Sequence, residues 1–179
     1  VTELQNLDIP VAYEKRENIL ESPKIVQLVT MLRLITAVHL GQMQLANSLW
    51  PEVLSYPFWG FSVADIWKVS WQANQTHKNW SLTLLEHDVF RHAVLLVLTL
   101  AAQAQTETAE AILDGLIGTS AVQTGDSKTP SVRSPFRDYY FGKSPEDMYE
   151  LSVELQVLRE QYRAYTASSS ELMRATDLL

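Results

Sequence analysis

The chain has 179 residues, of which 46% are hydrophobic and 20% charged, so it is long enough for one domain with a buried core and its composition excludes a disordered protein. The net charge of −7 disfavours binding to a nucleic-acid backbone, which requires clustered Lys and Arg. No Cys is present, which excludes disulfides, thiolate metal sites and Cys nucleophiles, and a cytoplasmic or nuclear location is therefore expected.

Apolar residues at helical spacing, bounded by typical helix starts and stops, predict six helices, and a shorter one is expected from about Val11. The six span about 23–40, 42–55, 63–73, 79–105, 107–117 and 145–167. The second should kink or break near Trp50, because the ring of Pro51 removes a backbone donor. The fourth is expected to be the central helix. No alternating pattern typical of strands is present.

Some of these starts and stops are strongly encoded. Ser62 stands three residues before Asp65, as in a capping motif, and Thr106 can cap the short helix that follows it. Ser144 and Pro145 provide a cap and a first-turn proline for the last helix, which is expected from about residue 145. Between the last two helices, residues 118–143 are rich in Ser, Thr, Gly and Pro. This long loop is predicted to be either flexible or held against a surface.

Aromatic residues crowd into the segment 50–80, which contains every tryptophan of the chain: Trp50, Trp59, Trp67, Trp71 and Trp80. Trp67 and Trp71 are four residues apart on one helix face, and we expect them to be buried as a wedge between helices. Trp59 lies in a turn with Tyr56 and Phe58 and is predicted to point outward, so Trp59, Phe58 and Tyr56 are the candidate partner-binding residues of this segment. An aromatic ligand pocket is the other interpretation of this segment.

The last helix carries apolar residues in steps of three and four, a heptad seam formed by Met148, Leu151, Leu155, Leu158, Tyr162 and Tyr165. The seam covers about two and a half heptads, fewer than the three or four that indicate a coiled coil. It therefore packs either on the domain's own core or on a second chain. In the second case Leu151, Leu155, Leu158 and Tyr162 would bind the partner.

No residue pattern indicates chemistry. His87 and His92 are five residues apart rather than three or four, so they do not share a helix face as a metal-binding pair would. Glu86, His87 and Asp88 could supply acid and base groups, but no nucleophile, phosphate loop or paired-carboxylate motif accompanies them. A polar helix face is the favoured interpretation. No catalytic residue, cofactor or metal is expected.

The stretch 41–57 resembles the second helix of a tetratricopeptide-type hairpin. A small residue, a bulky residue, an Ala, an aromatic residue and a closing Pro recur there at a similar spacing. Ala46 resembles the close-packing alanine of that pattern, and Trp50 resembles the large residue that fills the hairpin. Similar hairpins occur in the PCI-class subunits of the proteasome lid and the signalosome, which serve as scaffolds. The resemblance implies a helical-hairpin scaffold.

Together these patterns predict one all-α domain over residues 1–179, an irregular bundle or short α-solenoid of about six to seven helices with one long loop. The expected function is a non-catalytic protein–protein interaction or scaffold module that binds another protein or a second copy of itself. The alternative is a domain that encloses a small apolar ligand, with the aromatic segment 50–80 as the pocket wall. No nucleic-acid partner and no transmembrane segment are expected.

Overall fold

The computed structural model describes residues 21–123, 131–142 and 145–168, with side chains described for 21–123, 131–142 and 148–160. The described residues form eight α-helices and two 3-10 helices. Their β structure is limited to one isolated antiparallel bridge between Val122 and Val132. The α-helices are α2 (Pro23–His39), α3 (Met43–Leu54), α4 (Val63–Thr76), α5 (Trp80–Leu85), α6 (Arg91–Gln103), α7 (Ala109–Ile117), α8 (Phe136–Phe141) and α9 (Pro145–Ser168), and the 3-10 helices are η2 (Pro57–Trp59) and η3 (Asp88–Phe90). The all-α prediction is confirmed.

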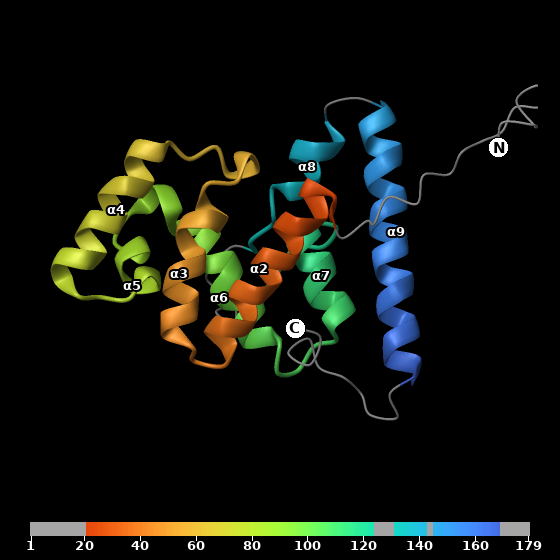
Figure 1. Cartoon of the computed structure of the whole chain (residues 1–179), viewed down its shortest axis with the longest axis horizontal. Coiled ribbons are helices and arrows are strands. Elements are labelled where there is room, and N and C mark those ends of the chain that lie inside the picture. The colour runs from red at the N-terminus through yellow and green to blue at the C-terminus, as the bar shows by residue number, and fades with distance from the viewer. Residues whose placement is uncertain (1–20, 124–130, 143–144, 169–179) are drawn as a thin grey trace, which may run out of the picture.

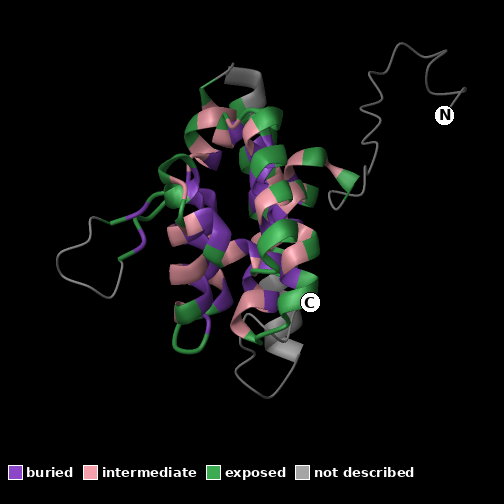
Figure 2. Cartoon of the chain, turned by 90° about the vertical axis from the view of Figure 1, so that its left-hand side faces the viewer, coloured by how far each residue is buried: buried purple, intermediate pink, exposed green. Residues whose placement is uncertain are grey.

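Helix α2 is the centre of the arrangement, because it packs against α3, α6, α7 and α9 (Figure 1). Helices α4 and α5 lie at one end of the long axis of the molecule, and α9 lies at the other end. Buried residues gather between the helices rather than on their outer sides (Figure 2). The largest contributions to this core come from α2 and α6, with Ile25, Leu28, Met31, Leu34, Leu96 and Leu100 fully buried.

One expectation for the middle of the chain is wrong. Residues 79–105 do not form one central helix, because the chain becomes extended at His87 and separates α5 from η3 and α6. This break brings Phe90 into the core, where the centroid of its ring lies 4.7 Å from that of Phe61. It leaves Leu82 and Val89 exposed. No break occurs at Pro51, which lies inside the continuous helix α3.

Helices α2 and α3 pack against each other as a hairpin. Ala46 and Trp50 are both buried on the inner side of α3, and the indole Nε1 of Trp50 donates a hydrogen bond to Ser81 Oγ at 3.1 Å. The small side chain of Ala46 allows close packing of the helices, while Trp50 fills the space towards α5. Trp50 thus joins the hairpin to the α4–α5 end of the molecule.

The segment predicted as one long loop is folded over much of its length. Helix α8 lies inside it, and Val122, Val132, Ser134 and Phe136 are buried. Gly118 ends α7 in the left-handed conformation, with φ of +88°, and a Cβ there would lie 2.4 Å from the carbonyl oxygen of Ser134. Residues 124–130 lie outside the described residues, as do the expected helix from Val11 and the cap at Ser144.

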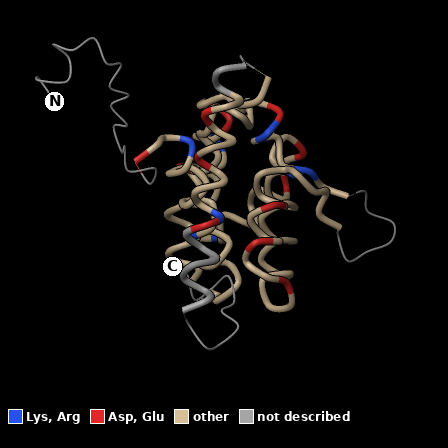
Figure 3. The backbone as a smooth tube through the Cα atoms, turned by 90° about the vertical axis from the view of Figure 1, so that its right-hand side faces the viewer, with Lys and Arg blue, Asp and Glu red and all other residues tan. Residues whose placement is uncertain are grey.

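Helix α9 packs on α8 and α2, so the seam meets the domain's own core. Lys24 of α2 forms an ion pair with Glu150 at 2.8 Å, and Arg159 forms another with Asp114 of α7. Figure 3 views this end of the molecule and shows Lys and Arg scattered along the coloured part of the chain rather than gathered in a continuous basic stripe. Among the described helices, none is both long and apolar enough to cross a membrane.

Candidate interaction surface on helix α4

Helix α4 has a capped start and ends at a left-handed residue. The hydroxyl of Ser62 accepts a hydrogen bond from the backbone N–H of Asp65 at 3.1 Å and donates one to Asp65 Oδ2 at 2.7 Å, so the predicted capping motif is present. The hydrogen bond from Ser62, followed by the hydrogen bond and positive charge of Lys68, lowers the pKa of the Asp65 carboxyl. At the other end His77 adopts the left-handed conformation, with φ of 51°.

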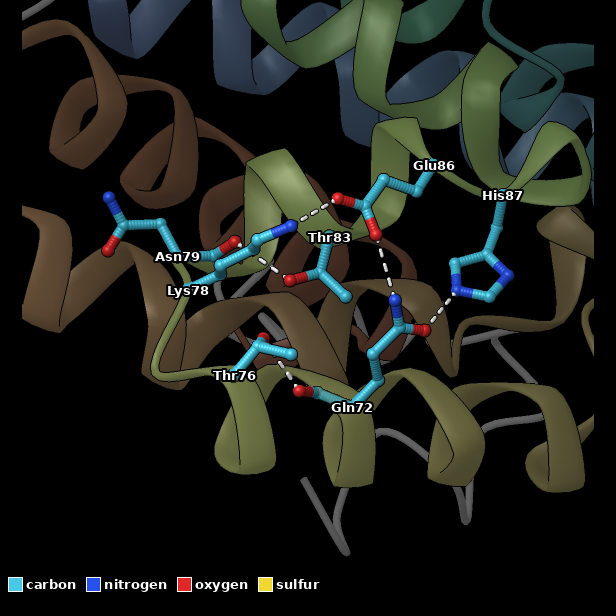
Figure 4. Close-up of polar contacts among 7 residues, drawn as sticks. All are labelled: Gln72, Thr76, Lys78, Asn79, Thr83, Glu86 and His87. Carbon is cyan, nitrogen blue, oxygen red and sulfur yellow. Dashed lines mark hydrogen bonds and ion pairs between the residues drawn. The ribbon is translucent and has the colours of Figure 1, made fainter.

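A polar network connects α4 to the break between α5 and η3 (Figure 4). The amide of Gln72 donates to Glu86 at 2.8 Å and accepts from His87 at 2.7 Å, while the ammonium of Lys78 pairs with Glu86 at 2.6 Å. The hydrogen bond and charge of Lys78 lower the pKa of the Glu86 carboxyl. Because the pKa of Glu86 is lower in the folded state, this carboxylate stabilises the fold at pH values above its ordinary pKa of about 4.3. The stabilisation is lost as the pH falls through the folded-state pKa.

Two apolar stripes run along α4, and only one of them is covered. Ile66, Val69 and Ala73 face inward and are buried, in a helix that packs on α3 and α5. The opposite stripe consists of Val63, Trp67 and Trp71 at steps of four residues, with exposed fractions of 70%, 69% and 65%. The expectation that Trp67 and Trp71 form a buried wedge is therefore wrong, because the aliphatic stripe of the same helix takes the place against the core.

The turn before α4, predicted to present aromatic residues outward, is instead part of the core. Phe58 is buried, and the centroid of its ring lies 5.8 Å from that of Tyr56 and 5.4 Å from that of Phe136 in α8. Trp59 is half-buried and stacks on Phe61 with the ring planes 3° apart. Helix α8 supplies this cover. The residues Phe136, Tyr139 and Tyr140, spaced as on one helix face after Pro135, were the sequence signal for it.

Burial also governs the chemistry of Tyr56. Its hydroxyl donates a hydrogen bond to Glu52 Oε1 at 3.1 Å, and desolvation by burial raises its pKa to about 12. Its role in this structure is packing within the aromatic core.

The predicted seam residues of α9 are divided by the fold. Leu151 and Leu155 are buried and Leu158 is half-buried, while the side chain of Tyr162 lies outside the described residues. Met148, Tyr149 and Val153 are exposed on this helix. Leu151 and Leu155 are therefore not open to a partner in this structure.

A groove of about 450 Å³ lies between the end of α2 and the start of α3, lined by Arg33, Thr36, Ala37, Leu40, Gln42, Leu45 and Leu49. Its position differs from the pocket predicted within the aromatic segment 50–80. Arg33 forms no ion pair or hydrogen bond with other described side chains. The groove thus combines leucine walls with one guanidinium group.

Three of the four histidines hold helices and loops together. His39 Nδ1 donates to the carbonyl of Ala101 at 2.8 Å, His92 Nε2 donates to the carbonyl of Arg133 at 2.8 Å, and His87 bonds to Gln72. In the described part of the chain no three His, Asp or Glu side chains gather as metal ligands would. These contacts are those of structural histidines.

Comparison of the chain with protein-family models, with curated proteins and with solved structures finds no match. The feature with the least structural explanation is the outer stripe of α4, since the fold holds that helix firmly and yet leaves two tryptophans in water.

Proposed function

We propose that the chain is a non-catalytic protein–protein interaction module and that the outer face of α4 is its contact surface. The single observation that carries this proposal is the pair of exposed tryptophans, Trp67 and Trp71, one helical turn apart on an anchored helix. Trp is the side chain most enriched among residues that dominate binding energy at interfaces. A contiguous exposed apolar patch on a monomer is often functional.

The patch has the size of an interface centre. Exposed apolar area contributes ~25 cal/mol per Å² when it is buried, and each Trp offers about 150–250 Å² in total. Little ordering of the backbone is needed on binding, because the Gln72 network and the Ser62 cap already hold the start and middle of the helix in place. A preorganised aromatic pair of this kind is typical of a docking surface.

A photo-crosslinking amino acid at position 71 tests the proposal in the cells that make the protein. We expect covalent adducts with a protein from position 71 and none from position 149 on α9, where Tyr149 has an exposed fraction of 75%. Tyr149 is a matched control because it is an exposed aromatic residue at the other end of the molecule. Equal adduct formation at both positions, or none at position 71, would contradict the proposal.

A small apolar ligand is the second candidate, and the groove between α2 and α3 favours it. Its volume of about 450 Å³ falls within the ~300–1,000 Å³ of ligand pockets, and Arg33 could pair with a carboxylate at its edge. Native mass spectrometry of the purified chain tests this candidate. A bound molecule that is lost in Arg33→Ala would support a ligand-binding function, and an empty wild-type chain would speak against it.

The helical-hairpin scaffold and the cytoplasmic or nuclear location belong to the same proposal. The buried pair of Ala46 and Trp50 supports a hairpin of the tetratricopeptide type, and the absence of Cys supports a reducing compartment. Microscopy of the tagged full-length protein tests the location, and an extracellular or organellar signal would contradict it.

A further inference from the structure

We infer that the partner of the α4 face is a second copy of this chain, bound with the two α4 helices antiparallel. This inference rests on the proposed function and names the partner of the same surface. Three properties of the face support it: its local charge, the alternation of large and small side chains along it, and its place at one end of the molecule.

The α4 end is electrically neutral within an acidic protein. Residues 61–92 contain three acids and three bases, so the net charge of −7 lies entirely on the rest of the chain. The acids and bases pair locally as Asp65–Lys68 at 3.0 Å, Glu86–Lys78 at 2.6 Å and Asp88–Arg91 at 3.2 Å. Two copies therefore repel one another least when they meet through this end, and a strongly charged partner would find no unpaired acid or base here.

The face itself carries no charged residue. Trp67 lies at its centre, with Val63 and Trp71 one turn away on either side. Ala64 and Ser70, each three residues from Trp67, flank it with small side chains. In an antiparallel pair centred on Trp67, Ala64 faces Ser70 of the second copy and Val63 faces Trp71. The two copies of Trp67 then meet at the centre, and the small pairs of Ala64 and Ser70 beside them allow the helices to approach closely.

The described part of the chain leaves the outer side of α4 open for this pairing. Helix α4 lies at one end of the long axis, and its inner face is already occupied by α3 and α5 (Figure 1). Two copies can meet end to end while α9 of each remains far from the contact. The resulting interface is isologous and closed, so it predicts a dimer rather than a fibre.

The exposed area sets the expected strength. About two thirds of the surface of Val63, Trp67 and Trp71 is exposed, which amounts to about 400 Å² per copy. A dimer would bury about 800 Å² in total, less than the ~1,200–2,000 Å² of standard interfaces. Neighbouring side chains add to this area. We therefore expect a reversible dimer that dissociates in the micromolar range.

Sedimentation of the purified full-length chain across a concentration series tests the dimer. We expect a monomer–dimer equilibrium, at least tenfold weaker in Trp71→Ala and in Ala64→Glu and unchanged in Tyr149→Ala. Ala64 is exposed, so Ala64→Glu should fold normally, and circular dichroism checks this. A chain that stays monomeric at several hundred micromolar, or a dimer that Trp71→Ala leaves intact, overturns the inference.

The absence of Cys allows a direct test of the antiparallel register. The single variants Ala64→Cys and Ser70→Cys are mixed and oxidised. We expect the mixed disulfide to form in excess of either symmetric one, and a dominant link between two copies of Ala64→Cys overturns the register. The proposed function fails separately: crosslinks from position 71 to a different protein, with a monomeric chain, would end the inference and leave the interaction module standing.

Discussion

Two aromatic groups lie close together in the sequence and have opposite fates in the structure. Tyr56 and Phe58, in the turn before α4, are buried, whereas Trp67 and Trp71, on α4 itself, are mostly exposed. The difference lies in what covers them. Helix α8 packs on the turn, and among the described residues nothing packs beyond the outer stripe of α4.

This contrast shows that aromatic content alone does not indicate burial. Helix α4 has two apolar stripes, and the one with the smaller side chains, Ile66, Val69 and Ala73, fills the narrow space beside α3 and α5. Close packing between helices favours such residues, while a tryptophan pair needs more room than this gap offers. The mutations below test whether covered and uncovered side chains differ as the structure requires.

The largest effect is expected for Phe58→Ala, because this ring touches Tyr56, Trp59, Phe136 and Tyr140. Its loss should lower the free energy of unfolding by about 3–5 kcal/mol, the range for a large aromatic removed from a core. Urea denaturation followed by circular dichroism measures the change. A loss below about 1 kcal/mol would mean that the turn is not part of the core.

Leu155→Ala should have the next largest effect, since Leu155 is buried where α9 packs on the domain. We expect a loss of about 2–5 kcal/mol in the free energy of unfolding, with the protein still a folded domain. Val153→Ala on the exposed side of the same helix is the matched control and should stay within about 0.5 kcal/mol of the wild type. Similar values for both variants would show that α9 is not docked through this seam.

A smaller and pH-dependent effect is expected at Tyr56, whose pKa is raised to about 12 by burial. A raised folded-state pKa contributes stability below the unfolded value of about 10, and this contribution is lost as the pH rises towards 12. The melting temperature of the wild type should therefore fall more steeply above pH 10 than that of Tyr56→Phe. Parallel curves for the two proteins would indicate that the hydroxyl is in water.

The smallest effect on stability is expected for Trp67→Ala. Its side chain has an exposed fraction of 69%, so the free energy of unfolding of the dissociated monomer should change by no more than about 0.5 kcal/mol. Trp50→Ala, which removes a fully buried indole, is the contrasting variant and should lose about 3–5 kcal/mol. Comparable losses at both positions would place Trp67 in the core.

Local signals in the sequence predicted the fold class and many element boundaries, and burial was harder to predict. The start of α4 at Ser62 and the end of α7 at Gly118 follow from capping and glycine conformation, while the burial of Ala46 was implied by the resemblance to a tetratricopeptide-type hairpin. The break at His87 could not be predicted in this way, because it depends on Phe90 reaching a core built from distant segments. Helix α8 was missed because its aromatic residues stand within a polar stretch.

The candidate site required the structure, since periodicity gives two stripes on α4 and does not say which one faces the core. The tryptophans were recognised as partner-binding residues only in the turn, where Trp59 is in fact stacked on Phe61 and half-buried. Exposed fraction depends on the helices that surround a side chain, and these come from residues far away in the sequence.

Hydroxyl-radical footprinting with peptide mass spectrometry tests most directly whether Trp67 and Trp71 are exposed on the folded chain while Trp50 and Trp80 are buried. In dilute, monomeric protein we expect Trp67 and Trp71 to be oxidised many times faster than Trp50 and Trp80. Raising the protein concentration should slow oxidation at Trp67 and Trp71 alone. Slow oxidation of Trp67 and Trp71 in the dilute monomer, at the rate of Trp50, would contradict the account.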